Sequence, residues 1–369
     1  MITITEPCEG ELFYSFPCNQ EELLFFDIET TGFSAKTSAL YLIGGLYYKN
    51  NHWEMTQWFA DDYESEKELL KCFFKFMKNF SFLIHFNGNG FDIPFLLKKC
   101  EQHELTGTKY NFEQIHSFDI YKAIYPHKKR LNMENLKQKT IEAFLHINRE
   151  DTYTGGELIA FYRKYLKIKE NSPEEAKELQ SFLLLHNHDD LAGMLQFSNV
   201  LFLTDLLNGN TTFSDVSAKQ TENTVLFQGI LPFSFEVSFS AKTETFHLTL
   251  ERNMLTLSVL TCQETLKYFY DNYKEYFYLP KEDTAIHKSV ATYVDKEFRQ
   301  KAKKETCYTK KEGIFLPSYS TKLKPAFRVD YASKHYFIET TDAFLQDNSL
   351  LLDYLNCFLR ENKELFLSS

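Results

Sequence analysis

The sequence lacks paired cysteines and long apolar runs, and it is poor in glycine and proline. Its seven cysteines are scattered over 369 residues without a CxxC pair, which argues against a disulfide framework and against a structural zinc site. No apolar run approaches the roughly 18 residues of a membrane span. The first residues, MITITEPCEGELF, have neither the basic nor the apolar region of a signal peptide. These absences predict a reduced, cytoplasmic protein without a membrane segment.

Basic charge is also scarce. The net charge is −10, and the residues up to position 205 include 30 acidic and 21 basic side chains, against 21 and 20 in the rest. A nucleic-acid partner would therefore need local basic patches, because the overall field repels phosphate. An acidic half is also compatible with a carboxylate-rich metal site.

Aromatic side chains, by contrast, are abundant, with 36 Phe and 22 Tyr, so the chain can bury a large core. Its length favours two domains over one. Strands and helices are predicted to build a first domain over residues 1–207. The first three strands can form an antiparallel meander, whereas the later two need crossover connections and add in parallel. This order predicts an α/β fold, with a mixed five-stranded sheet and helices on both faces. The expected strands cover 23–28, 39–48, 52–60, 82–86 and 116–121, and the expected helices cover 64–80, 92–103, 134–145, 155–168 and 173–206.

The composition and the hydrophobic pattern change beyond about residue 210. Residues 208–224 are rich in polar residues and are predicted to be a linker. Residues 225–369 are predicted to form a smaller α+β domain, with no internal repeat. Alternating patterns over 233–240, 245–260 and 326–339 indicate hairpins, and helical patterns cover 287–302 and 349–362.

Two carboxylates stand out at the end of the most apolar strand, in the stretch LLFFDIETTG. Asp27 and Glu29 are two positions apart, so their side chains point to the same face of the strand. Adjacent carboxylates repel each other unless a cation lies between them, and a hard divalent ion suits oxygen ligands. The alternative is an acidic strand end that meets solvent. The TTG that follows turns the chain sharply, and Gly32 has no side chain to obstruct a ligand.

The motif DIETTG resembles the first motif of the DEDD, or DnaQ-like, 3′–5′ exonucleases of the ribonuclease-H-like superfamily. That resemblance implies a second Asp after a later strand, and Asp92 in FNGNGFDIP fits, although it could simply cap a helix. It also implies a helical Asp that is preceded by Tyr four residues earlier or by His five residues earlier. In HNHDDL, His186 precedes Asp190 by four residues, so the two share one helix face. This is the spacing of the tyrosine subclass with His in place of Tyr. The motif looks like the HN-x-x-D of YprB-type members. Asp189 is the alternative to Asp190 as the motif residue. A non-functional interpretation is a solvated polar patch on an amphipathic helix.

The resemblance covers roughly residues 20–205 and implies a metal-dependent 3′–5′ exonuclease that hydrolyses phosphodiester bonds of DNA or RNA. Asp27, Glu29, Asp92 and Asp190 would hold two divalent ions, Mg²⁺ or Mn²⁺. His186 would orient or deprotonate the attacking water. Asp119, in the segment between the second and last motifs, is expected to be structural or to support the ligands.

The expected partner is nucleic acid, at single-stranded 3′ ends. Basic runs at 127–130 and 299–311 can receive phosphates, or they can be ordinary solvated surface. Other readings are a catalytically silent module that binds nucleic acid or scaffolds a complex, and a phosphodiesterase for short oligonucleotides. Protein partners are not indicated. The residues expected to contact nucleic acid are Thr30, Thr31, Gly32, Asn87, Lys128, Lys129, Arg130, Lys301, Lys303 and Lys304.

Overall fold

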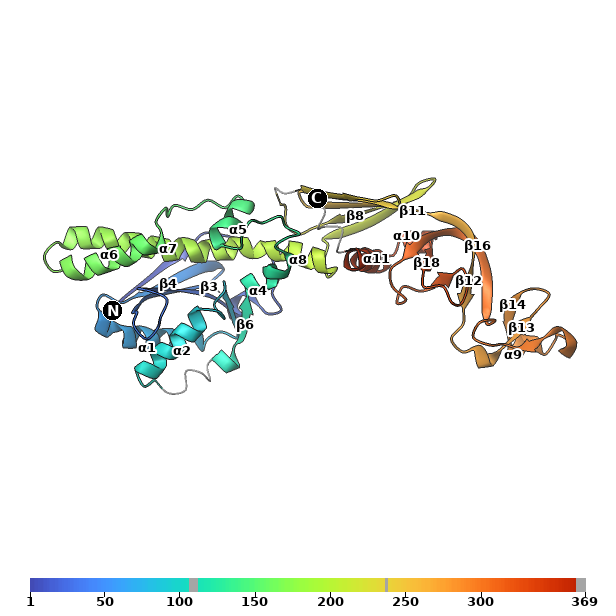
Figure 1. The fold of residues 1–369 in the computed structure, drawn as a ribbon, viewed down its shortest axis with the longest axis horizontal. Helices are drawn as coiled ribbons and strands as arrows, with labels where there is room; N and C mark the ends of the chain where they lie inside the picture. Colours follow the sequence, from blue (N-terminus) through green and yellow to red (C-terminus); the bar gives the residue numbers. More distant parts are fainter. Residues whose placement is uncertain (106–111, 236–237, 363–369) are drawn as a thin grey trace. The chain divides into compact units, whose positions relative to one another are not determined.

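The computed structural model describes residues 1–105, 112–235 and 238–362. The chain divides into two compact units, residues 1–204 and 205–369 (Figure 1). The segment 208–224, which the sequence suggests as a linker, contains a strand, β7 (Asp215–Gln220), that pairs with its neighbour in a sheet of the second unit. Alternate side chains of β7 are shielded, so a polar sequence is compatible with a strand that is only half covered.

The first unit contains a mixed sheet with the strand order β1-β4-β3-β2-β5-β6. The five expected strands are present, and β5 and β6 add to β2 in parallel while β3 and β4 form the antiparallel part. A sixth strand that the sequence analysis did not anticipate, β1, pairs antiparallel with the outer edge of β4. The strands are β1 (Ile2–Cys8), β2 (Leu23–Thr30), β3 (Leu40–Lys49), β4 (His52–Phe59), β5 (Phe82–His85) and β6 (His116–Asp119).

Helices cover both faces of this sheet (Figure 1). The predicted run over 173–206 is interrupted: it ends as a helix at Phe197, and a short 3-10 turn at Ser198–Val200 precedes the next helix. Helices that the structure describes in this unit include α1 (Glu66–Met77), α2 (Asp92–Gln102), α4 (Ile120–Ile124), α5 (Gln138–Phe144), α6 (Gly155–Ile168) and α7 (Pro173–Phe197). Helix α8 (Leu201–Asn208) begins in this unit and ends in the second.

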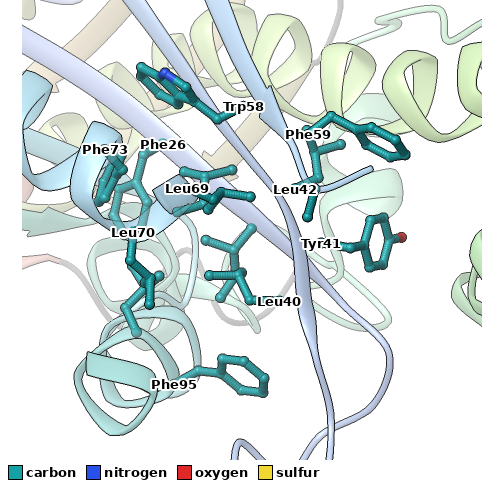
Figure 2. Close-up of a cluster of buried hydrophobic side chains, with 14 of the residues drawn as sticks. Phe26, Leu40, Tyr41, Leu42, Trp58, Phe59, Leu69, Leu70, Phe73 and Phe95 are labelled. Atoms are coloured by element: carbon teal, nitrogen blue, oxygen red, sulfur yellow. The ribbon is translucent and has the colours of Figure 1, made fainter. Parts of the chain in front are cut away.

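Burial on both faces explains why β2 begins with four apolar residues in succession. Leu23 to Phe26 are all at most 1% exposed. Phe26 packs on Phe73 of α1 with ring centroids 5.6 Å apart, whereas Phe25 points to the other face and meets Trp53. Figure 2 shows the side chains of β2, β3, β4, α1 and α2 that fill this core. A strand covered on both faces reads as a continuous apolar run.

Helix α7 approaches β3 closely because β3 has a glycine at the crossing point. A Cβ on Gly44 would lie 2.1 Å from Asn187 Oδ1 and 2.4 Å from Leu191 Cδ1. Gly44 is also the register partner of Asp27 in β2. The glycine therefore allows α7 to bring its side chains down to the strand that holds the first two carboxylates.

The second unit is α+β and consists largely of antiparallel sheet. It has a five-stranded sheet of order β7-β8-β11-β10-β9, a small closed barrel β12-β16-β18-β17 and a three-stranded sheet β14-β13-β15. Helix α11 (Asn348–Glu361) covers the five-stranded sheet, where Tyr354 stacks on Phe227 at 4.7 Å. The main strands are β8 (Thr224–Ile230), β9 (Ser238–Lys242), β10 (Phe246–Glu251), β11 (Met254–Leu260), β12 (Cys262–Phe269), β16 (Tyr308–Ser318), β17 (Phe327–Arg328) and β18 (Tyr336–Glu339).

The helix expected over residues 287–302 is wrong. That segment contains the end of β14 (Thr284–His287), the single turn α9 (Lys288–Ala291), a 3-10 turn at Lys296–Phe298 and β15 (Gln300–Lys301). The helical spacing of its apolar residues is overridden by pairing of β15 and β14 with the two edges of β13 (Tyr276–Leu279). Among the described residues, no helix is both long and apolar enough to cross a membrane.

Candidate active site

Three elements bring four carboxylates and one imidazole together at the carboxyl end of β2. Asp27 and Glu29 lie on β2, Asp92 begins α2, and His186 and Asp190 lie one turn apart on α7. Donor atoms of Glu29, His186 and Asp190 all lie within 4.8 Å of one another. Asp27 and Asp92 lie near enough to feel the charge of Asp190, so the residues expected from the three sequence motifs lie near one another.

The carboxylates at this site strongly perturb one another. Burial, reinforced by the charges of Asp190, Glu29 and Asp92, holds the pKa of Asp27 well above its ordinary value. Burial likewise raises the pKa of Glu29 to about 8, although the nearby His186 opposes the shift. Burial raises the pKa of Asp92 to about 7, against hydrogen bonds from the backbone, including that of Ile28. Such a cluster is unfavourable without a cation, because several negative charges share a poorly solvated space.

His186 bridges the cluster and Asp151, a buried residue in the loop before α6. Its Nδ1 lies 2.7 Å from Asp151 Oδ2, and its Nε2 lies 3.5 Å from Glu29 Oε1 and 3.6 Å from Asp190 Oδ2. Burial alone would lower the pKa of His186, but the charges of Glu29 and Asp190 and the bond to Asp151 raise it overall. One ring nitrogen is thus anchored, and the other faces the carboxylates.

Asp27 is held by the second residue of the HN-x-x-D motif. The Asn187 amide donates to Asp27 Oδ2 at 3.0 Å, and Asn187 Oδ1 accepts a hydrogen bond from Gln57 Nε2 at 2.9 Å. Asn187 is fully buried. Gln57 also donates to the Leu184 carbonyl, so this chain of hydrogen bonds ties α7 to β4 and fixes one Asp27 oxygen.

Asp190 is oriented by a buried arginine. Arg149 Nη2 donates to Asp190 Oδ1 at 2.6 Å, while its Nη1 reaches both oxygens of Glu142 at 2.9 and 3.1 Å. Burial would lower the pKa of Arg149, but Asp190 and Glu142 raise it. Gly193 leaves room for this arrangement, since a Cβ there would lie 2.4 Å from Glu142 Oε1. Asp190 Oδ1 is therefore bound to Arg149, and Oδ2 faces His186.

Asp189, the alternative to Asp190, binds the backbone of the loop before α6. Its Oδ2 accepts hydrogen bonds from the backbone N–H groups of Glu150 and Asp151, both at 2.8 Å. His188 pairs with Asp189 and lies beside Cys8 of β1. Its hydrogen bonds with Asp189 and with Cys8 raise the pKa of His188 to about 10. Asp189 thus anchors the loop before α6.

Asp119 supports the turn that leads to Asp92. Its Oδ1 accepts from the Asn87 backbone N–H at 2.9 Å, and its Oδ2 lies 3.8 Å from His85 Nδ1. Asn87 has φ +59°, a left-handed conformation that asparagine tolerates well. His85 in turn accepts from the Gly88 N–H. Asn87, expected to contact nucleic acid, is therefore placed in the turn between β5 and α2.

The TTG segment forms the turn between β2 and β3. Thr30 Oγ1 donates to the Gly32 carbonyl at 3.0 Å, and Thr31 Oγ1 accepts from the Ala39 N–H at 2.8 Å. A Cβ on Gly32 would lie 2.7 Å from Ser38 Oγ. The next residue, Phe33, is 94% exposed, and its ring lies edge-on to Phe91, which directly precedes Asp92.

The two basic runs lie apart in the chain. In the first unit, Lys128 to Arg130 follow a 3-10 turn, and Arg130 contacts the ring of buried His127 at 3.3 Å. In the second unit, exposed Lys301 ends β15, and exposed Lys303 and Lys304 follow it. Within the described part of the chain these three lysines have no ion-pair partner, whereas Lys310 and Lys311 of the same run pair with Asp283 and Glu339.

Several polar residues of the site escaped the sequence analysis. Asn187 is part of the HN-x-x-D motif, but the motif alone predicts no role for it. Arg149 and Asp151 belong to a loop with no periodic signal, whereas Glu142 lies in the expected helix over 134–145. Only their tertiary contacts reveal all three. Tyr41 of β3 also hydrogen-bonds to Glu29, and burial together with Glu29 raises its pKa well above the ordinary value.

Comparison with known protein families gives a match that lies within the first unit. Residues 24–201 match the family model of the RNase_H superfamily, so this part of the chain carries an RNase H-like domain. The rest of the chain lies outside that match.

The individual proteins that resemble this chain are each matched over only part of their own length. A DNA polymerase of Ostreid herpesvirus 1 (isolate France) is 25% identical over 116 residues, which is 26% of this chain and 6% of the polymerase. The family B DNA polymerase of Pyrobaculum calidifontis superposes on 71% of this chain and 36% of its own, with 13% identity and a TM-score of 0.39. Exonuclease I of Methylocaldum szegediense superposes on 43% of this chain and 42% of its own, with 11% identity and a TM-score of 0.30. The chain thus spans less than half the length of each.

Proposed function

We propose that this protein is a divalent-metal-dependent 3′–5′ exonuclease of the DEDD type, close to the YprB-type members, that acts on single-stranded 3′ ends. The observation that carries this proposal is the cluster of Asp27, Glu29, Asp92 and Asp190 beside His186 at the end of β2. The RNase_H superfamily match over 24–201 and the partial match to a viral DNA polymerase support nucleic acid as the substrate class.

The donor set fits divalent cations. Carboxylate oxygens are the ligands that Mg²⁺ and Mn²⁺ prefer. Burial, with repulsion from neighbouring carboxylates, raises the pKa values of Asp27, Glu29 and Asp92, so a bound cation would stabilise their charged forms. Arg149 is bound to Asp190 Oδ1, so Asp190 would offer Oδ2. When bound, two such ions would neutralise charge on the scissile phosphate and acidify the attacking water.

Other residues of the chain would orient the ligands, the water and the substrate. Asn187 holds Asp27 and Arg149 holds Asp190, so both carboxylates are oriented before any ligand arrives. His186 Nε2 faces the carboxylates, where it can orient the water or accept its proton. The exposed ring of Phe33, next to Phe91, can stack on an unpaired base at the 3′ end.

Basic residues would guide the strand. Lys128, Lys129 and Arg130 in the first unit, with Lys301, Lys303 and Lys304 in the second, are local exceptions in a chain of net charge −10. Each contributes mainly phosphate contacts, which carry affinity without sequence preference. The turns at Thr30–Gly32 and at Asn87 would contact the terminal nucleotide.

The experiment is digestion of 5′- and 3′-labelled DNA and RNA oligonucleotides by the full chain in Mg²⁺, Mn²⁺ or EDTA. A 3′–5′ exonuclease produces a ladder from the 5′ label and releases a mononucleotide at once from the 3′ label. Asp27→Asn and Asp92→Asn should abolish cleavage. The matched control is Glu21→Gln, which removes an exposed carboxylate from the same unit. Wild-type cleavage by either site variant contradicts the metal assignment, and binding without cleavage by the wild type favours a silent module.

A further inference from the structure

Asp151 is a buried carboxylate that none of the three motifs includes. It lies in the loop between α5 and α6, and its side chain is 0% exposed. Its Oδ2 accepts from His186 Nδ1 at 2.7 Å, and its Oδ1 accepts from the Tyr153 N–H at 3.0 Å. Arg149 and Lys139 lie at 3.4 and 3.5 Å from Oδ2. A carboxylate is buried at a cost unless such partners satisfy it, and His186 has the shortest contact among them.

The loop that carries Asp151 is held by the helix that carries His186. Asp189 of α7 accepts from the Glu150 and Asp151 N–H groups, three residues along from His186. Asp151 therefore meets His186 at a position set by two separate contacts with the same helix. The arrangement is rigid enough to select one orientation of the imidazole.

That orientation separates the two ring nitrogens. With Nδ1 bound to Asp151, Nε2 faces Glu29 and Asp190 at 3.5 and 3.6 Å. These separations are longer than a good hydrogen bond, so Nε2 is directed at the cluster without being tied to either carboxylate. When the hydrogen of a neutral imidazole lies on Nδ1, the lone pair lies on Nε2.

We infer that Asp151 is a positioning residue for the proposed hydrolysis, holding His186 with its hydrogen on Nδ1 and its lone pair on Nε2. The inference rests on the proposed function. In the step it serves, the water oxygen bonds to phosphorus while its proton moves to Nε2. The bond from phosphorus to the 3′ oxygen breaks, and its electron pair stays on that oxygen, which takes a proton from solvent. Asp151 stabilises the imidazolium that results, and Nε2 then returns its proton to solvent.

The first test reads the tautomer directly, without any cleavage. Histidine labelled with ¹⁵N is incorporated into the full chain in EDTA, and long-range ¹H–¹⁵N correlations are recorded at a pH where the imidazole is neutral. The signal of His186 is identified by its absence in His186→Gln. The wild type should carry hydrogen on Nδ1, and Asp151→Ala should shift it toward Nε2. Asp151→Asn keeps an acceptor in the same shape and should retain the wild-type tautomer, which also guards against a variant that fails to fold.

The second test is kinetic. Asp151→Ala should lower kcat by about 10- to 100-fold, as loss of a residue that orients a catalytic group does, with KM for the oligonucleotide unchanged. In the His186→Gln background the same substitution should have no further effect, because the two residues act as a unit. Lys139→Gln is the matched control: it removes a half-exposed partner of Asp151 and leaves the contact with His186.

The outcomes separate the two proposals. An active wild type whose tautomer or kcat is insensitive to Asp151→Ala overturns the role of Asp151 and leaves the exonuclease intact. Effects of Asp151→Ala and His186→Gln that multiply independently overturn it too. A wild type without nuclease activity overturns the proposed function, and the catalytic role of Asp151 with it, whatever the tautomer.

Discussion

The amide of Asn187 donates a hydrogen bond of 3.0 Å to Asp27, across the contact between helix α7 and the central strand β2. The two residues lie 160 positions apart in the chain. Their contact is possible because β3, the neighbour of β2 in the sheet, has a glycine where the helix packs against it. The last motif of the site thus supports the first, and the site depends on the packing of α7 as much as on its carboxylates.

Gly44→Ala should therefore destabilise the first unit. The new Cβ would meet Asn187 Oδ1 at 2.1 Å and Leu191 Cδ1 at 2.4 Å, and overpacking of this kind costs about 1–3 kcal/mol. Gly45→Ala is the matched control on the same strand, where the nearest atom is the end of Leu24 at 3.3 Å. Thermal unfolding followed by circular dichroism compares them. Equal melting temperatures for the two variants would show that α7 does not press on β3 at Gly44.

His186→Ala should lower the rate of cleavage by roughly 10²–10⁴ if His186 acts on the attacking water, with little change in metal affinity. His188→Ala should be close to wild type, because His188 lies beside Asp189 and Cys8. Single-turnover cleavage measures the rate, and titration calorimetry with Mn²⁺ measures affinity. Lost Mn²⁺ binding in His186→Ala would make His186 a metal ligand, and near-normal cleavage would make it structural.

The metal-free protein should become less stable as the pH rises. Glu29 has a pKa of about 8 in the folded protein against an ordinary 4.5, and Asp92 about 7 against 3.8. Between these values the folded state binds more protons than the unfolded state, so the free energy of unfolding falls with increasing pH. The loss should begin above about pH 4 and be nearly complete above about pH 8.

Melting temperatures in EDTA, measured from about pH 5 to about pH 9, test this dependence. Glu29→Gln should flatten the profile and raise stability at the alkaline end. Saturating Mn²⁺ should stabilise the wild type most at high pH, where fewer protons compete for the carboxylates. A wild-type profile that rises over this range would mean that the cluster is ionised and compensated without a cation.

Charge reversal at Lys301, Lys303 and Lys304 should weaken oligonucleotide binding and flatten its salt dependence, because fewer counterions are released. Turnover of a very short substrate should stay unchanged. A control triple reversal at Lys219, Lys242 and Lys322 alters exposed lysines elsewhere in the second unit. Affinity measured against salt concentration decides the matter. Identical slopes for wild type and the first triple variant would indicate ordinary solvated surface and favour a protein partner for this unit.

Local patterns in the sequence were enough to predict the central strands and their order. The run Leu23–Phe26 reads as a strand buried on both faces, and the structure buries it on both faces. The spacing of Asp27 and Glu29, and of His186 and Asp190, determines which side chains share a face, because strand and helix periods are local properties. Residues 287–302 show where this reasoning fails: a helical spacing of apolar residues is overridden when a neighbouring strand offers edge pairing.

The surroundings of the carboxylates depend on tertiary contacts that no local pattern predicts. Sequence patterns alone were enough to place Asp27 and Glu29 at the end of a strand and Asp92 at the start of a helix. They also placed His186 and Asp190 on one face of another helix. They did not determine that Asn187 reaches Asp27, that Arg149 binds Asp190, or that Asp151 anchors His186. These contacts join residues 35 to 160 positions apart. Two of them are made by residues of an irregular loop, whose sequence has no helical or strand periodicity. Their partners are chosen by how α7 packs on β3 and how Asp189 holds that loop, and packing is a property of the folded chain as a whole.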